Sequence, residues 1–185
     1  MAPAPKLQIC IAGSAADQHY GPELEALASE VGRLVGESGN ILVFGANVDT
    51  DTLGTVAARA ARRAGGLAVG ITYGTDKNIV FREDSTDVLV ATGSERGGGR
   101  EFVLIHSCDA VIMIAGGAGT LTEAAIAYQE YVPIVALAGS GGWADKLAGT
   151  FFDARERVPV LSARTPEEAV EIALREGAKP KIRVV

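Results

Sequence analysis

Short apolar runs alternate with amphipathic segments along the chain, and this pattern predicts strands separated by helices. The clearest strand signal is the apolar run within DAVIMIAGG at residues 109–117. The clearest helix lies at residues 22–39, between a proline suited to the first turn and a glycine suited to the end. We expect strands at residues 7–13, 41–45, 67–74, 87–93, 109–117, 132–139 and 158–163, and helices at residues 22–39, 52–66, 100–108, 120–131, 142–147 and 165–177.

This order of elements predicts an α/β fold, a doubly wound and mostly parallel Rossmann-like sheet with helices on both faces. Helical crossovers place successive strands parallel, and near-continuous apolar strands indicate burial on both faces. No linker or repeat interrupts the pattern, so residues 1–185 are expected to form a single domain. Such folds bind ligands at the carboxyl ends of their strands. The segments expected there are residues 13–17, 45–51, 73–77, 92–100 and 116–123.

Net charge, cysteine content and hydropathy limit the kinds of partner and the cellular location that we expect. A formal charge of -6 argues against a nucleic-acid surface but does not exclude a local site for a small anion. Cys10 and Cys108 both lie beside apolar runs, as expected of buried free thiols in a reducing cytosol. The N-terminus lacks a signal-peptide pattern, and no apolar run reaches the roughly 18 residues of a membrane span. We therefore expect a cytoplasmic protein without a membrane partner.

The segment GGAGTLTE at residues 116–123 is the strongest candidate for chemistry. Gly116, Gly117 and Gly119 allow a backbone to approach an anion closely, and the helix that follows presents free N–H groups. With the hydroxyl of Thr120, they predict a phosphate site that has Glu123 at its rim as a candidate catalytic carboxylate. TLTE also matches a capping box, in which Glu123 only satisfies the start of the helix. Residue chemistry alone slightly favours the capping interpretation.

A second glycine run, Gly97–Gly99, precedes Arg100 at the start of a predicted helix. This position brings Arg100 to the same rim as Glu123. A guanidinium can hold a phosphate through two parallel hydrogen bonds. The alternative is a surface arginine paired with Glu101, but the glycine run favours a functional role.

Weaker candidates follow the first two strands. Gly13 and Ser14 could offer a backbone N–H and a hydroxyl to a ligand, or they could form only a turn. Gly45 ends the second strand at the same edge and is a candidate contact for the ligand. Neither GxGxxG nor GxxxxGK[ST] occurs, so a dinucleotide or P-loop site lacks its fingerprint. His19 is typical of a solvated loop histidine.

The loop GANVDTDTLG after the second strand carries two acidic residues, Asp49 and Asp51, that could hold Mg²⁺. Capping of the next helix by Asp51 or Thr52 explains this loop better. We therefore predict no metal site.

GGAGTLTE resembles the PGGxGTxxE motif of the LONELY GUY family, often labelled "possible lysine decarboxylase". That family also has an arginine at the start of the helix before the motif strand, where this chain has Arg100, and the Asp109–Ala110 pair agrees as well. The late GGWADKL is similar to the family's aromatic turn. The resemblance extends over roughly residues 7–148.

The resemblance implies cleavage of nucleoside 5′-monophosphates, including cytokinin ribotides, into base and ribose 5-phosphate without a cofactor. It implies that Arg100 orients the nucleotide and that Glu123 stabilises an oxocarbenium-like transition state or positions water. The 116–120 loop would hold the phosphate, and the protein would form a homodimer or homotetramer. Decarboxylation with pyridoxal phosphate finds no support, because it needs a Schiff-base lysine and all five lysines lie outside the two motifs.

Three departures from the family pattern indicate a side branch. Ala115 replaces the motif proline, Glu101 replaces the lysine that usually follows the arginine, and GANVDTDTLG replaces a glycine-rich turn. In this the chain is similar to molybdenum cofactor carrier proteins, which bind a phosphorylated pterin without turning it over. The alternatives to hydrolysis are therefore a non-catalytic carrier of molybdenum cofactor or another phosphorylated ligand, and a nucleotide sensor.

Overall fold

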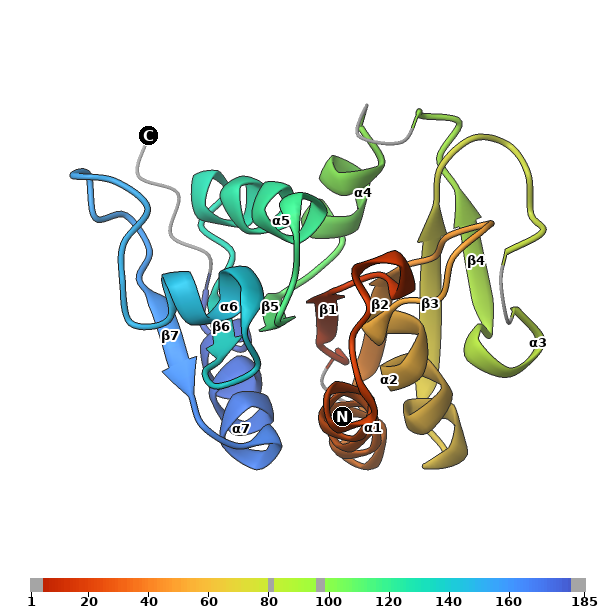
Figure 1. Cartoon of the computed structure of the whole chain (residues 1–185), viewed down its shortest axis with the longest axis horizontal. Helices are drawn as coiled ribbons and strands as arrows, with labels where there is room; N and C mark the ends of the chain where they lie inside the picture. Colours follow the sequence, from red (N-terminus) through yellow and green to blue (C-terminus); the bar gives the residue numbers. More distant parts are fainter. Residues whose placement is uncertain (1–4, 80–81, 96–98, 181–185) are drawn as a thin grey trace.

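A seven-stranded sheet forms the centre of the computed structural model, which describes residues 5–79, 82–95 and 99–180 (Figure 1). The strands are β1 (Gln8–Gly13), β2 (Ile41–Gly45), β3 (Leu67–Thr72), β4 (Val88–Ala91), β5 (Ala110–Ile114), β6 (Ile134–Leu137) and β7 (Val160–Ala163). They pair in the order β4-β3-β2-β1-β5-β6-β7, and every neighbouring pair is parallel. The predicted α/β fold is confirmed, and the sheet is parallel throughout.

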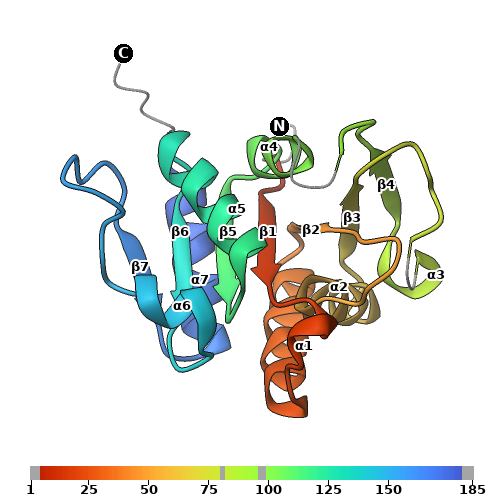
Figure 2. The same cartoon turned by 45° about the horizontal axis from the view of Figure 1, so that its top comes forward.

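Helices cover both faces of the sheet (Figures 1 and 2). One face carries α1 (Pro22–Glu37), α2 (Leu53–Arg63) and α7 (Pro166–Gly177), and the other carries α4 (Arg100–His106), α5 (Ala118–Gln129) and α6 (Gly142–Leu147). Two short elements, η1 (Ala16–Gln18) and α3 (Arg82–Ser85), complete the order and lie outside the predicted helices. Within the described ranges, no helix is long and apolar enough to cross a membrane.

The core is aliphatic and lies in two layers, one on each face of the sheet. Alternate residues of β1 divide between them, because side chains of a strand point to opposite faces. Ile9 and Ile11 pack into the layer with α1 and α2, whereas Cys10 belongs to the layer with α4 and α5. Cys10 and Cys108 are buried free thiols, as predicted. A hydrogen bond with Cys108 and burial raise the pKa of the Cys10 thiol well above its ordinary value.

Helix α5 begins earlier than the sequence predicts, and this makes the capping-box interpretation wrong. The helix starts at Ala118, with Gly117 as the N-cap and no side-chain cap. Thr120 and Glu123 therefore lie inside the helix, three residues apart on one face, and both are buried. In the loop after β2, by contrast, the capping interpretation is confirmed, because the side chain of Thr52 accepts a hydrogen bond from the start of α2.

The topology opens a crevice between β1 and β5. These strands are neighbours in the sheet, yet the chain continues from β1 to α1 on one face and from β5 to α5 on the other. Parallel sheets bind ligands at such a switch point, outside the carboxyl ends of the strands. The predicted motif after β5 lies at this edge.

Candidate functional site

Arg100 is the first residue of α4 and is only 8% exposed, so it is not a surface arginine. Gly99 precedes it with φ 136°, a conformation that favours glycine; Gly97 and Gly98 lie outside the described residues. The guanidinium lies directly over Gly45, where an added Cβ would stand 1.7 Å from Nη1 of Arg100. Gly45 therefore makes room for the arginine at the end of β2.

Two buried carboxylates flank Arg100. Its Nη2 lies 3.2 Å from Oε1 of Glu101, and its Nη1 lies 3.7 Å from Oε1 of Glu123. The second distance is too long for a hydrogen bond. Within the described part of the chain, neither Nε nor Nη1 of Arg100 has a hydrogen-bond partner. Buried donors without partners are costly, so they indicate a position where a polar ligand group binds.

Glu123 titrates near neutral pH. Burial raises the pKa of its carboxyl group to about 7; Arg100 lowers the pKa, and Glu101 raises it. Because a carboxylate is poorly solvated inside a protein, burial disfavours its charged form. Both protonation states of Glu123 are therefore populated around pH 7. A perturbed carboxyl beside a guanidinium in a cavity is typical of functional sites.

The first turn of α5 faces the same space. The first intrahelical bond runs from the amide of Leu121 to the carbonyl of Gly117, at 3.0 Å. The amides of Ala118, Gly119 and Thr120 come before it and have no partner within the helix. An added Cβ on Gly119 would meet nothing within 4 Å. This helix start is thus open, and its positive dipole end attracts anions.

Ser14 connects the two loops at the switch point. Its Oγ accepts a hydrogen bond from the amide of Gly116, at 2.9 Å. Gly13, the residue before Ser14, packs closely against Leu53, since an added Cβ on Gly13 would lie 2.9 Å from Cβ of Leu53. The amide of Gly116 is therefore already used within the protein. This hydrogen bond joins the loop after β1 to the loop after β5.

A cavity of about 120 Å³ collects most of the predicted site residues. Its lining includes Gly13, Gly45, Arg100, Gly117, Gly119, Thr120 and Glu123. Ser14 and Gly116 line an adjacent cavity of about 480 Å³ instead. Sequence reasoning missed Gln18 and Asn47, which also line the small cavity. Asn47 lies within the predicted strand-end segments and Gln18 one residue beyond them, so chain position was the available signal.

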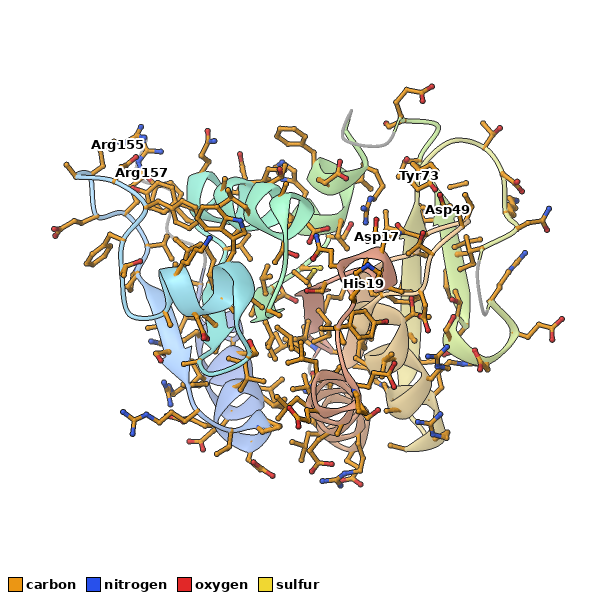
Figure 3. All side chains as sticks on the ribbon, in the orientation of Figure 1. Asp17, His19, Asp49, Tyr73, Arg155 and Arg157 are labelled. Carbon is orange, nitrogen blue, oxygen red and sulfur yellow. The ribbon has the colours of Figure 1, made fainter. Side chains whose placement is uncertain are left out.

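Asp49 and Asp51, in the loop after β2, contact different partners. The hydroxyl of Tyr73 donates to Oδ1 of Asp49 at 3.3 Å, and both side chains are labelled in Figure 3. Asp51 pairs instead with Arg59, at 3.0 Å. Among the residues that the structure describes, no group of three or more His, Cys, Asp or Glu side chains is arranged to hold a metal. His19, after β1 in Figure 3, lines the larger cavity.

The sequence matches a family of known proteins. A model described as the SLOG cluster4 family matches residues 6–170. A cytokinin riboside 5′-monophosphate phosphoribohydrolase of Mycobacterium tuberculosis is 36% identical over 104 residues, which are 55% of this chain and 52% of that protein. The matched region thus spans about half the length of this relative.

Solved structures share the fold over nearly the whole chain. An X-ray structure of a structural-genomics target is 29% identical, with a TM-score of 0.80 over 91% of this chain and 99% of that one. The molybdenum cofactor binding protein from Rippkaea orientalis is 24% identical, with a TM-score of 0.76 over 94% and 98%. The family model and the relative from M. tuberculosis confirm the resemblance expected from the sequence, and the solved structures confirm the fold.

Proposed function

The chain belongs to the SLOG cluster4 family, and from this premise we propose that it binds a phosphorylated, nucleotide-like ligand and hydrolyses the N-glycosidic bond of a nucleoside 5′-monophosphate. One observation carries the proposal. Buried Arg100, whose Nε and Nη1 lack a hydrogen-bond partner among the described residues, shares a small cavity with Glu123 and the start of α5. The activity in the name of the M. tuberculosis relative supports this chemistry.

Each part of the cavity has a task in this reaction. The amides of Gly119 and Thr120 and the threonine hydroxyl bind phosphate oxygens, and Arg100 donates to oxygen atoms of the sugar. Ionised Glu123 stabilises the positive charge that develops at the anomeric carbon. Water adds to that carbon as its bond to the base nitrogen breaks. The base leaves with the bonding electron pair and takes up a proton, and ribose 5-phosphate remains.

Chromatography of free base, released from AMP and from isopentenyl-AMP, tests the hydrolase proposal. We expect Glu123→Gln to reduce release at least about 100-fold, since the amide cannot offset the developing charge. Glu171→Gln is the matched control, because its side chain is 78% exposed on α7. Wild-type release should rise as Glu123 ionises around pH 7. If wild-type protein releases no base, or Glu123→Gln releases it equally fast, the hydrolase proposal is wrong.

A carrier is the second candidate, and Glu101 favours it. This carboxylate makes the shorter contact with Arg100, at 3.2 Å, and it opposes ionisation of Glu123. A site so arranged favours binding over turnover, and the fold shared with a molybdenum cofactor binding protein agrees. Native mass spectrometry of protein purified from cells that make the cofactor distinguishes the two. An intact pterin at stoichiometric amounts supports the carrier, whereas an empty protein that releases base supports the hydrolase.

A further inference from the structure

The buried charges of the site do not balance. One guanidinium, that of Arg100, lies between the carboxyl groups of Glu101 and Glu123, and all three side chains are buried. The ion pair with Glu101 is the closer one, at 3.2 Å, whereas 3.7 Å separates Nη1 of Arg100 from Oε1 of Glu123. Arg100 is therefore held more closely by one carboxyl group than by the other.

The contact between Arg100 and Glu101 is not a simple result of their neighbouring positions in the chain. They are the first two residues of α4, and consecutive residues of a helix do not normally face each other. Nη1 of Arg100 lies directly over Gly45, at the end of β2. The guanidinium therefore lies across the start of α4, where Gly45 and Glu101 limit its position.

Glu101 is a better partner for the guanidinium than Glu123 at neutral pH. Glu101 belongs to the first turn of α4, where the helix dipole favours negative charge. Glu123 lies within α5, beyond its first turn, and burial raises the pKa of its carboxyl group to about 7. Because Glu123 is partly protonated around this pH, it attracts the guanidinium less than Glu101 does.

Glu101 reaches the small cavity through Arg100. Arg100 and Glu123 line that cavity, whereas Glu101 is not one of the described residues around it. Nε and Nη1 of Arg100 have no hydrogen-bond partner in the described part of the chain, and Nη2 is the atom that contacts Glu101. The ion pair with Glu101 thus leaves the other donors of the guanidinium for a ligand.

We propose that Glu101 is a positioning residue, which holds Arg100 away from Glu123 so that the guanidinium and the carboxyl group are both available to the ligand. This role rests on the proposed binding of a phosphorylated ligand in the small cavity. Without Glu101, the guanidinium would close the gap to Glu123 and form a charge-assisted hydrogen bond. That bond would occupy the two groups that the ligand needs.

Titration of the Glu123 carboxyl group by ¹³C NMR tests the proposal without a ligand. Glu101→Met removes the acceptor and fills a similar volume, whereas Glu101→Gln removes the charge and keeps an oxygen acceptor. Both variants should lower the pKa of Glu123, because Glu101 raises it in the wild type. Glu101→Met should lower this pKa further, because the guanidinium then pairs with Glu123. The signal of Glu123 is identified by its absence from Glu123→Gln protein.

A double-mutant cycle measures the consequence for binding. The calorimetric probe is formycin 5′-monophosphate, whose base is joined to the sugar through a carbon–carbon bond and resists hydrolysis. Glu101→Met should weaken binding at least about tenfold, whereas Glu101→Gln should weaken it by at most about threefold. In a Glu123→Gln background, Glu101→Met should also cost at most about threefold, because no carboxylate is left to capture Arg100.

The outcomes separate the positioning role from the proposed function. An equal loss of affinity for Glu101→Met in both backgrounds, or an equal pKa of Glu123 in Glu101→Met and Glu101→Gln, overturns the positioning role. If wild-type protein binds no probe while the two pKa values differ as expected, the proposed function fails and the effect of Glu101 on Arg100 stands. Glu101→Leu, with the unfolding midpoint of each variant, provides a second protein without the acceptor should Glu101→Met fold poorly.

Discussion

At the scale of single residues, Arg100 and Glu123 show what a local pattern can and cannot reveal. Their identities and chain positions were enough to predict that both lie at the strand-end rim. Their burial was not predictable, because it depends on α4 and α5 packing over β2 and β1. The burial of Glu101 was not predictable either. Its carboxylate contacts Arg100 inside the protein, not at the surface.

The pKa of Glu123 predicts how stability depends on pH. Its value rises from 4.5 to about 7 on folding, so between these limits only the folded state holds the proton. The free energy of unfolding should therefore fall as the pH rises through this window, by at most about 3 kcal/mol. Glu123→Gln should flatten this dependence, whereas exposed Glu171→Gln should keep it. Urea unfolding at several pH values measures both, and parallel curves for Glu123→Gln and wild type would contradict the prediction.

Ala115 shows why the family proline is absent here. Its φ is 53°, a left-handed conformation that proline cannot adopt, and its amide donates to Oγ of Ser140 at 2.8 Å. Ala115→Pro should destabilise the protein by at least about 3 kcal/mol. Ala115→Gly should stabilise it by up to about 1 kcal/mol, because glycine tolerates this φ. Denaturant midpoints check both variants, and a fully stable Ala115→Pro protein would show that the loop takes another conformation.

At the scale of elements, α1 and α2 pack backbone against backbone. An added Cβ on Gly32 would lie 2.0 Å from the carbonyl oxygen of Ala57, and one on Gly36 would lie 2.5 Å from that of Ala61. Gly32→Ala should therefore destabilise the protein by about 2 kcal/mol or more, despite the better helix propensity of alanine. Gly119→Ala is the control, since its site is open and the change should be neutral or stabilising. Equal stability of the two variants would refute this packing.

Helices and strands were predicted correctly where the apolar pattern was long. The start of α5 and the two shortest helices were not predicted. All seven strands and six of the helices lie where apolar periodicity indicated. The four-residue α3 and the η1 turn have no periodic signal to detect. The start of α5 was misplaced because TLTE fits a cap, while Gly117 and the loop held by Ser14 begin the helix earlier.

At the scale of the whole molecule, a homodimer or homotetramer stays a prediction. Phe102 and Val103 on α4 are 54% and 38% exposed, and we expect a second copy to cover them. Light scattering should give a mass above that of one chain, and Phe102→Asp should lower it while the far-UV circular dichroism of the folded chain is kept. A wild-type protein of monomeric mass at micromolar concentration would overturn the prediction.

The sequence by itself determined the α/β class, the parallel sheet and the edge at which a ligand would bind. It could do so because these features follow from periodicity along the chain and from the fixed geometry of crossovers. The single domain also remains a prediction from that pattern. Tertiary structure alone decided that Arg100 lies over Gly45, between two carboxylates, and that Gln18 lines both cavities at this edge. Contacts between distant segments depend on packing distances and desolvation, for which no local pattern of residues is a signal.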